Sequence, residues 1–498
     1  MQILKFLDDF MYYPILIVVL AAAAIYFSVR TRFIQIRLFP EALRVLLEKP
    51  DDKQSVSSFQ ALMVSTASRV GTGNIIGISS AIVLGGPGAV FWMWVLAILG
   101  SATAFIESTL AQIYKRKDNA DNCYGGPAYY IETALKSKFL AILFVLFLIC
   151  TYGFGFNLLC SYNLQSTFAV YPFYHPQTTP IIIGAIVALL TLFCLLGGGK
   201  GIVKITEILV PVMGISYVIV SAIVLVVNAR AIPGMFVLIF SDAFSPRSFA
   251  GGLAGSCLIY GIKRGLYSNE AGVGSAPNAA ASAMVSHPVK QGLVQVVSVF
   301  IDTMLICTST ALMCLSTGVA RTKDIQGAPY VQEAIRSVLG SFGPTFIAFA
   351  MTLFSFTTLL GNLYYCENAL AYLNHNKRPS KPFMTCFHIL CSLIIFVGAI
   401  SASDVAWALA DITMGLMALI NIPCCIRMGG LVIRTAKDYE LQKKAGKNPV
   451  FLEGRRNPRI GLLERITSKK INGKVTNLVI STLPFFDCSF IEAVLTYI

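Results

Sequence analysis

Charged residues are scarce in this chain. Of its 498 residues only 13% are Asp, Glu, Lys or Arg, whereas 56% are hydrophobic and the mean hydropathy is +0.70. A soluble domain of this size needs many more charges on its surface, so the composition excludes a water-soluble fold. The sequence therefore predicts an all-α integral membrane protein.

Residue types that hold metal centres or perform nucleophilic catalysis are also few. The chain has four histidines, and its 13 cysteines include no C-x-x-C pair. Most cysteines lie inside apolar runs, which is typical of small buried side chains. The apolar runs contain no H-E-x-x-H motif, Ser–His pair or Asp dyad. We therefore expect no enzyme activity, no cofactor, and no zinc, haem or iron–sulfur centre.

Apolar runs long enough to cross a bilayer recur along the chain. A membrane-spanning helix needs roughly 17 to 25 residues, and on that basis we expect about eleven transmembrane helices. They cover residues 10–29, 56–84, 88–114, 139–170, 180–197, 203–228, 246–283, 289–318, 342–373, 384–401 and 405–433. The first run is preceded by acidic residues and lacks a small-residue cleavage site, so we expect it to be retained rather than removed as a signal peptide.

Basic residues are unevenly distributed between these runs. With the amino terminus outside, the inner segments carry 30 of the 39 Lys and Arg residues and the outer segments carry six; the other three are Arg69, Lys263 and Arg264. Because Lys and Arg concentrate in cytoplasmic loops, we expect a multi-pass protein of the cell membrane with its carboxyl terminus in the cytoplasm. The net charge of +14 then belongs to the inward-facing surface, and we expect no nucleic-acid partner.

The ten spans after the first divide into two sets of five. Each set opens on an apolar run that glycine and polar residues interrupt, at residues 70–74 and 265–272. Because five is odd, the second set is inverted relative to the first, which predicts an inverted repeat whose interrupted helices meet near the bilayer centre. The expected regions are an extra amino-terminal helix with a basic linker (1–55), two five-helix repeats (56–228 and 246–433) and a basic cytoplasmic tail (434–498).

An interrupted span leaves backbone N–H and C=O groups unpaired inside the bilayer. Such groups are tolerated only where protein or a wet cavity covers them, so the interruptions predict a binding site. An amino acid zwitterion fits: its carboxylate would meet the N–H groups around Thr72 and Gly73. A sodium ion would meet carbonyl oxygens near Ala67 and Val70 with the side chain of Asn74. The alternative is a glycine-lined helix crossing without a ligand.

The second interrupted run leads into residues 271–283, of which ten are Ala, Gly or Ser. We expect this segment to be a helix packed on other backbone. The charges of Lys263, Arg264 and Glu270 precede it, and a charge at a helix centre costs about 2.5 to 3.5 kcal/mol, so the segment cannot face lipid. Expected ion pairs join Glu270 to Arg264 or Arg69, either as an inner gate or as a static pair.

These motifs resemble those of the alanine or glycine:cation symporters. The residues that carry the resemblance are T-A-S-R-V-G-T-G-N-I (66–75), G-G-P-G-A-V-F-W-M-W (85–94), G-G-P-A-Y-Y (125–130) and R-G-L-Y-S-N-E-A-G-V-G-S-A-P (264–277). The match extends from about residue 10 to 430. It implies a leucine-transporter-like fold and sodium-coupled uptake of a small neutral amino acid, with Ser268 and Asn269 among the substrate-binding residues.

Polar residues on the span 342–373 extend the expected sodium site. Phe354, Thr357 and Thr358 are spaced i, i+3, i+4 and share one helix face. One carbonyl and two hydroxyls from this face, with two carbonyls from the first interrupted helix, would make a five-oxygen cage, a pattern that resembles transporters of the leucine-transporter type. The alternative is that both threonines bond their own helix.

Four further polar residues lie within spans. The resemblance implies an aromatic residue directly after Gly361, where this chain has Asn362, and an amide there would admit serine, glutamine or another polar amino acid. Gln165 matches a substrate-lining glutamine of the family, although such a residue also serves as an interhelical contact. Asp302 is expected near an ion site or paired with Arg69, and Asp411 as a gate or a solvated cap. For both acids we favour structural pairing.

The expected function is sodium-coupled symport of a small neutral amino acid of the alanine or glycine class into the cell by alternating access. The partners are the amino acid, Na⁺ and the lipid bilayer, and we assign no oligomeric state. One alternative is sodium- or proton-coupled transport of a larger polar amino acid such as glutamine. Another is a channel, which would need a continuous polar pore that two isolated interruptions do not provide.

Overall fold

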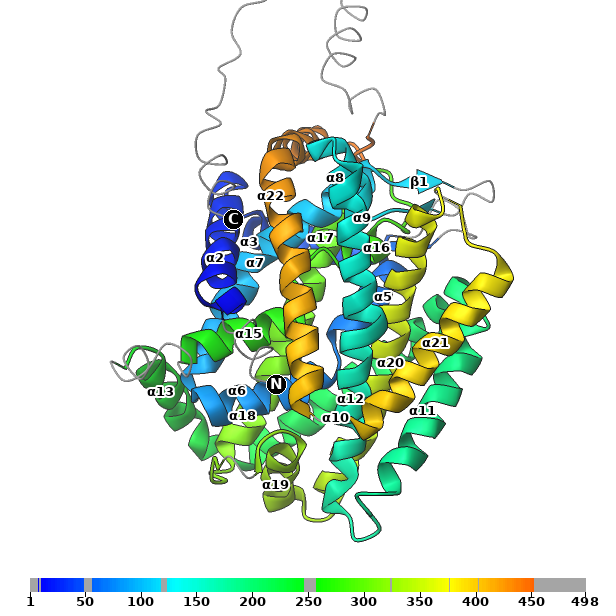
Figure 1. The fold of residues 1–498 in the computed structure, drawn as a ribbon. Coiled ribbons are helices and arrows are strands. Elements are labelled where there is room, and N and C mark those ends of the chain that lie inside the picture. Colours follow the sequence, from blue (N-terminus) through cyan, green and yellow to red (C-terminus); the bar gives the residue numbers. More distant parts are fainter. Residues whose placement is uncertain are drawn as a thin grey trace, which may run out of the picture. The chain divides into compact units, whose positions relative to one another are not determined.

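The computed structural model describes residues 8, 10–48, 56–117, 123–245, 257–322, 325–375, 377–401 and 403–451. The chain forms two compact units, residues 1–450 and 451–498, and all but Phe451 of the second unit lies outside the described residues. The expected tail is therefore described only as far as residue 451. The first unit is built almost entirely from helices (Figure 1).

Within the described residues, seven helices are long and apolar enough to cross a membrane. They are α7 (Gly88–Ile113), Lys138–Val170, α12 (Gly198–Val227), Pro288–Ser316, α20 (Phe342–Leu373), α21 (Lys381–Ile400) and Val405–Lys444. The second span consists of α9 (Lys138–Leu148), η3 (Ile149–Gly155), α10 (Phe156–Ser166) and η4 (Thr167–Val170). The fourth consists of α17 (Pro288–Val299), η7 (Phe300–Cys307) and α18 (Thr308–Ser316). The last is part of α22 (Ser403–Lys444).

The other four expected spans coincide with shorter helices. Two are the apolar helices α2 (Ile17–Arg30) and α11 (Thr179–Leu195), and two are the interrupted runs, which are divided into pieces too short to cross a bilayer alone. Residues 246–256 of the second interrupted run lie outside the described residues. The number of spans and the inverted repeat therefore stay predictions.

Short elements connect the long helices. They are η1 (Met11–Leu16), α3 (Ile34–Arg37), α4 (Phe39–Leu46), the antiparallel pair β1 (Arg116–Lys117) and β2 (Cys123–Tyr124), α8 (Pro127–Leu135), η5 (Ala229–Ala231), α13 (Ile232–Ala243) and α19 (Ala328–Leu339). Helix α22 continues eleven residues past the expected end at 433, because ion pairs hold its last turns against α3 and α4: Arg37 lies 2.8 Å from Glu440, and Lys443 lies 2.8 Å from Glu41.

The first interrupted run divides where the sequence predicts. Helix α5 (Ser58–Arg69) begins with a capping box, in which Ser57 and Gln60 exchange side-chain to backbone hydrogen bonds of 3.0 Å, and it ends at Val70. The chain then continues through the π-helical turn η2 (Gly73–Gly77) into α6 (Ile78–Gly85). Glycine is required at Gly73, where an added Cβ would lie 2.6 Å from the Tyr267 ring.

The second interrupted run divides later than expected. Helix α15 (Cys257–Asn269) passes through Gly265 without a break, because this glycine serves close packing: an added Cβ would lie 3.3 Å from Leu96 on α7. The helix ends where Glu270 takes a left-handed conformation with φ of 53°, and Gly272 and Gly274, both with φ of 90°, continue the irregular chain.

The expected helix over residues 271–283 is also wrong. Only one turn forms there, α16 (Pro277–Ala280), since the left-handed residues before it cannot continue a helix. All thirteen residues of this segment are buried, as a segment that cannot face lipid must be.

Packing places the interrupted helices at the centre of the first unit. Helix α5 contacts α12 and α20, whereas α15 contacts α6 and α7, and η2 contacts α15 and η7. The extra amino-terminal helix α2 lies alongside α7, outside these contacts, and α11 lies alongside α21 (Figure 1). The two interruptions are thus enclosed by other helices on several sides.

Candidate binding site at the two interrupted helices

The two interruptions meet in the structure. Ser68 Oγ, in the last turn of α5, lies 3.4 Å from Oε1 of Glu270, the first residue of the second interruption. On the other side of the break, Asn74 of η2 and Ser268 of α15 both bond the carboxylate of Asp302 on η7. The expected site residues of the two helices therefore lie around one small buried region.

The expected sodium ligands are partly brought together. Thr358 Oγ1 donates to the carbonyl oxygen of Ala67 over 3.1 Å, which joins α20 to α5. Thr357 Oγ1 instead bonds its own helix at Leu353, over 3.0 Å, and at Phe354, over 3.2 Å. For Thr357 the alternative interpretation thus describes the observed contact. All five expected cage residues, Ala67, Val70, Phe354, Thr357 and Thr358, are buried.

The side chain of Asn74 forms hydrogen bonds at the first break. Its Oδ1 accepts a hydrogen bond of 2.8 Å from the amide of Gly71, and its Nδ2 donates to Asp302 Oδ1 over 2.7 Å. The side-chain oxygen expected on sodium is therefore occupied by a backbone donor in this arrangement. An amide oxygen has two lone pairs, so the one that does not accept the Gly71 amide could still bind a cation.

Asp302 accepts hydrogen bonds from side chains of three elements, which are η2, α15 and its own η7. Besides Asn74, it accepts hydrogen bonds of 2.8 Å from Ser268 and from Thr303. The side chain is fully buried and makes no ion pair with Arg69 or any other described residue. The favoured pairing of Asp302 with Arg69 is therefore wrong, and its place near an ion site stays a prediction.

The end of α15 presents a free donor. Asn269 Oδ1 accepts a hydrogen bond of 3.1 Å from the amide of Ala271, whereas its Nδ2 is buried and finds no acceptor among the described residues. A buried unpaired donor costs about 1 to 3 kcal/mol unless a ligand or water accepts the hydrogen bond. This atom is therefore suited to contact a bound solute.

Helix α10 contacts the first break through a residue that the sequence interpretation missed. Asn163 Nδ2 donates to Thr72 Oγ1 over 3.0 Å, whereas Gln165 accepts a hydrogen bond of 2.8 Å from Tyr174 in the following loop. Residues two positions apart on a helix are separated by about 200°, so these side chains occupy different faces. The hydrogen-bonding amide in the motif S-Y-N-L-Q was a usable signal for Asn163; a substrate role for Gln165 stays a prediction.

Asn362 is part of an interhelical network. Its Oδ1 accepts a hydrogen bond of 2.8 Å from Ser68, and its Nδ2 donates to Asn157 over 3.0 Å. The side chain is fully buried. The two ends of the amide thus connect α20 to α5 and to α10.

Aromatic side chains cover the first break. The ring of Tyr267 lies against Gly73, with its centroid 4.7 Å from that of Phe156 and 5.0 Å from that of Trp407. The guanidinium of Arg264 lies 3.8 Å from the centroid of Trp407. This aromatic stack of Phe156, Tyr267 and Trp407 joins helices α10, α15 and α22 next to the first break.

A cluster of four buried charged side chains lies next to these aromatic residues and contacts them through Arg264. Asp411 lies 3.3 Å from Lys263 and 3.5 Å from Arg264, and Lys263 lies 2.5 Å from Asp8 of the amino-terminal segment. The expected pair of Arg264 with Glu270 is therefore wrong, because Asp411 takes that cation. The interpretation of Asp411 as a solvated cap is also wrong, since only 1% of the residue is exposed.

A second buried charge cluster lies behind the interruptions. Glu270 accepts a hydrogen bond of 2.6 Å from Ser275, and Arg69 donates to Gln295 over 2.9 Å, so the expected pair of Glu270 with Arg69 does not form. Glu107 accepts hydrogen bonds from the amide of Gly272 over 3.3 Å and from an asparagine on α22 over 2.8 Å. The second interruption is thus held by carboxylates rather than by an ion pair.

Comparisons with known proteins identify the family of this chain. The model of the sodium:alanine symporter family matches residues 1–453. The amino-acid carrier protein AlsT of Bacillus subtilis is 41% identical over 433 residues, which cover 87% of this chain and 91% of the relative. The probable sodium/glutamine symporter GlnT of the same organism is 42% identical over 447 residues, which cover 89% and 91%.

A more distant relative and a solved structure also match this chain. The sodium/alanine symporter AgcS of Methanococcus maripaludis is 34% identical over 453 residues, covering 89% of this chain and 98% of the relative. The crystal structure of MhsT in complex with L-phenylalanine superposes with a TM-score of 0.54 at 13% identity, covering 84% of this chain and 99% of that chain. At this identity the likeness establishes the fold alone, and it is the leucine-transporter-like fold expected from the sequence.

Proposed function

Since the chain belongs to the sodium:alanine symporter family, we propose that it couples the inward movement of Na⁺ to uptake of a small neutral amino acid. Members of this family are multi-pass membrane transporters and not enzymes. The proposal adds the coupling ion, the solute class and the direction to that family assignment.

The observation that carries the proposal is the contact between α20 and the end of α5. Thr358 Oγ1 and the carbonyl oxygen of Ala67 approach to 3.1 Å at the end of α5, where no further helical turn follows to donate hydrogen bonds to the last carbonyl oxygens. Oxygen ligands from two different helices, one of them broken, are what a cation needs in order to couple its binding to helix movement. Sodium bound there would fix the conformation of Val70 and Gly71.

The surroundings of the break support a small solute. Tyr267 packs on Gly73 and Asn362 bonds Ser68, so a small solute would displace fewer side chains than a large one. The amides around Thr72 and Gly73 would bind the solute carboxylate, and the unpaired Asn269 Nδ2 would supply a second donor. Because the ion orders backbone that the solute also contacts, the two ligands would bind cooperatively.

The charge cluster of Asp8, Lys263, Arg264 and Asp411 would serve as an outer gate. With the amino terminus outside, as proposed, Asp8 would lie toward the outer side, and Arg264 connects the cluster to Trp407 of the aromatic stack. Outward opening would separate Arg264 from Asp411 and Trp407, and closing would restore these contacts. Each sodium ion driven inward gains about 2.3 kcal/mol per 100 mV, which sustains roughly fiftyfold accumulation of the solute.

A larger polar solute such as glutamine is the second candidate. It is favoured by the presence of Asn362, where the family resemblance implies an aromatic residue, and by the 42% identity to a relative named as a sodium/glutamine symporter. Admitting glutamine would require the Asn362 amide to leave Ser68 and Asn157 and to bond the solute.

Uptake by purified protein in proteoliposomes tests the proposal. Labelled alanine should accumulate with an inward Na⁺ gradient, should not accumulate with K⁺ in its place, and should be displaced most strongly by glycine, alanine and serine when all twenty amino acids compete. Displacement by glutamine as strong as that by alanine would favour the second candidate. Accumulation that ignores Na⁺ would contradict the proposal.

A further inference from the structure

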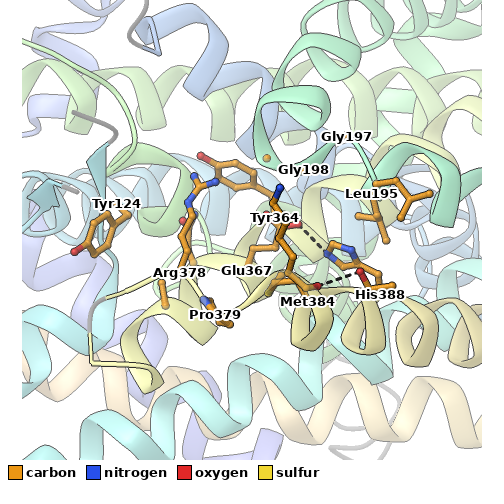
Figure 2. A pocket seen from close by; sticks show the side chains of 16 residues that line it. Tyr124, Leu195, Gly197, Gly198, Tyr364, Glu367, Arg378, Pro379, Met384 and His388 are labelled. Carbon is orange, nitrogen blue, oxygen red and sulfur yellow. Dashed lines mark hydrogen bonds and ion pairs between the residues drawn. The ribbon is translucent and has the colours of Figure 1, made fainter. Parts of the chain in front are cut away.

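A pocket of about 570 Å³ lies between the turn that joins α11 to α12 and the loop that joins α20 to α21 (Figure 2). Side chains of α20, including Tyr364 and Asn368, form one wall. In the orientation proposed above, both connections lie on the cytoplasmic side. Transport through the interrupted helices assigns no role to this pocket.

The polar wall of the pocket is basic. Arg378 of the α20–α21 loop and Lys381, the first residue of α21, line it, and neither side chain forms an ion pair with a described residue. Glu367 is the sole acid among the described residues that line the pocket, and its Oε1 lies 3.0 Å from Nε2 of His388. Figure 2 shows this bond as a dashed line and Arg378 extending into the pocket. The pocket therefore has uncompensated positive charge and suits an anion.

The helices that end at the pocket present an apolar surface. Ile186, Leu190 and Phe193 of α11 are between 53% and 76% exposed, and α21 exposes Leu390, Leu393 and Val397. In a membrane protein such side chains face acyl chains. Since Arg378 and Lys381 stand at the beginning of α21, the basic wall lies at the level where lipid headgroups meet this surface.

We propose that this pocket binds the phosphate headgroup of an anionic phospholipid from the cytoplasmic leaflet. Arg378 and Lys381 would donate charge-assisted hydrogen bonds to the phosphate oxygens, while Leu195 and Met384 would contact the start of the acyl chains. The volume exceeds what inorganic phosphate fills. An amino acid is a poor fit, because the carboxylate that would bind its ammonium group is bonded to His388.

The pocket is connected to the second interrupted helix. Asn368 Nδ2 donates a hydrogen bond of 3.3 Å to the carbonyl oxygen of Asn278 on α16. A lipid held against α20 would therefore stabilise the segment that follows the second break. The melting temperature of the protein should therefore rise as lipid occupies the pocket.

The test uses the full-length protein in detergent, titrated with phosphatidylglycerol or phosphatidylcholine. Retained lipid is counted by native mass spectrometry and the melting temperature is followed in parallel. Phosphatidylglycerol should bind and raise the melting temperature, whereas phosphatidylcholine should not. The double variant Arg378→Gln, Lys381→Gln should bind phosphatidylglycerol about thirtyfold more weakly, the loss expected for two basic side chains that each contribute about 1 kcal/mol.

Lys377→Gln is the matched control, because Lys377 is exposed in the same loop but does not line the pocket. This variant should retain wild-type affinity. Equal lipid binding by the double variant and the wild type would overturn the site. A rise in melting temperature with millimolar inorganic phosphate equal to that with phosphatidylglycerol would overturn the lipid assignment. Both results are independent of sodium coupling.

Discussion

Thr358 donates a hydrogen bond from Oγ1 to the carbonyl oxygen of Ala67, 3.1 Å away, and so joins the middle of α20 to the last turn of α5. The two residues are 291 positions apart in the chain. A contact over this separation holds a discontinuous helix against a continuous one. We base the proposed sodium site on this contact.

Removing this hydroxyl should weaken sodium binding. Thr358→Val keeps the shape of the side chain but loses one oxygen ligand, which is worth about 1 to 1.5 kcal/mol, so the Na⁺ concentration for half-maximal alanine uptake should rise about tenfold. The measurement is initial uptake rate against Na⁺ concentration in proteoliposomes.

Thr352→Val is the control for this substitution. Thr352 lies on the same helix, and its hydroxyl bonds only the carbonyl of Ala348, over 2.8 Å. It should leave the sodium dependence unchanged. An unaltered sodium dependence in Thr358→Val would remove Thr358 from the cation site.

Asn74→Ala should impair sodium and solute binding together. The substitution leaves the amide of Gly71 without its side-chain acceptor, at a cost of about 1 to 3 kcal/mol, and removes one of the hydrogen bonds to Asp302, which keeps those from Ser268 and Thr303. Half-saturating concentrations of both ligands should increase, while gel filtration still shows folded protein. If the alanine affinity falls and the sodium affinity does not, Asn74 binds only the solute.

Asp411→Asn should favour the outward-open state. It leaves Lys263 and Arg264 opposite a single carboxylate, that of Asp8, which weakens the contacts that close the outer side. The buried thiol of Cys307, which lies 3.1 Å from Ser268 Oγ, should then react faster with a membrane-impermeant thiol reagent, as measured by peptide mass spectrometry.

Cys314 provides the internal reference for that experiment. It is as completely buried as Cys307, but within the described part of the chain it makes no hydrogen bond to the polar residues of the interrupted helices, so its labelling should not change. Equal labelling of Cys307 in the variant and the wild type would show that the charge cluster does not gate the site.

The first interruption was predictable and the second only in part. At Gly71 and Gly73 the glycines mark the break itself, whereas Gly265 marks close packing of α15 on α7. The residue that ends α15 in a left-handed conformation is Glu270. Glutamate rarely takes this conformation, so the residue type at this position did not indicate the end of the helix. Only the glycines at 272 and 274 indicated an irregular chain.

The pairing of buried charges could not be read from the sequence. Arg264 has carboxylates at residues 270, 302 and 411 as candidate partners, and only the arrangement of α15 against α22 selects Asp411. Asn163 was missed for a similar reason, since its contact with Thr72 depends on the rotation of α10 about its axis. Periodicity predicts which residues share a face but not which neighbour that face meets.

Asn362→Ala should narrow the range of solutes. If the Asn362 amide can be released from Ser68 and Asn157 to bond a polar substrate, its loss should reduce competition by glutamine and serine about tenfold while alanine still competes. Competition of labelled alanine uptake measures this. An unchanged order of competitors would separate Asn362 from the solute pocket.

Sodium flux driven by the solute tests the central claim most directly. In proteoliposomes held without a sodium gradient, an inward gradient of alanine should drive radioactive sodium inward, with transport greatly reduced in Thr358→Val and unaffected in Thr352→Val. Sodium movement that is the same with and without alanine, in protein that still takes up alanine, would contradict the account.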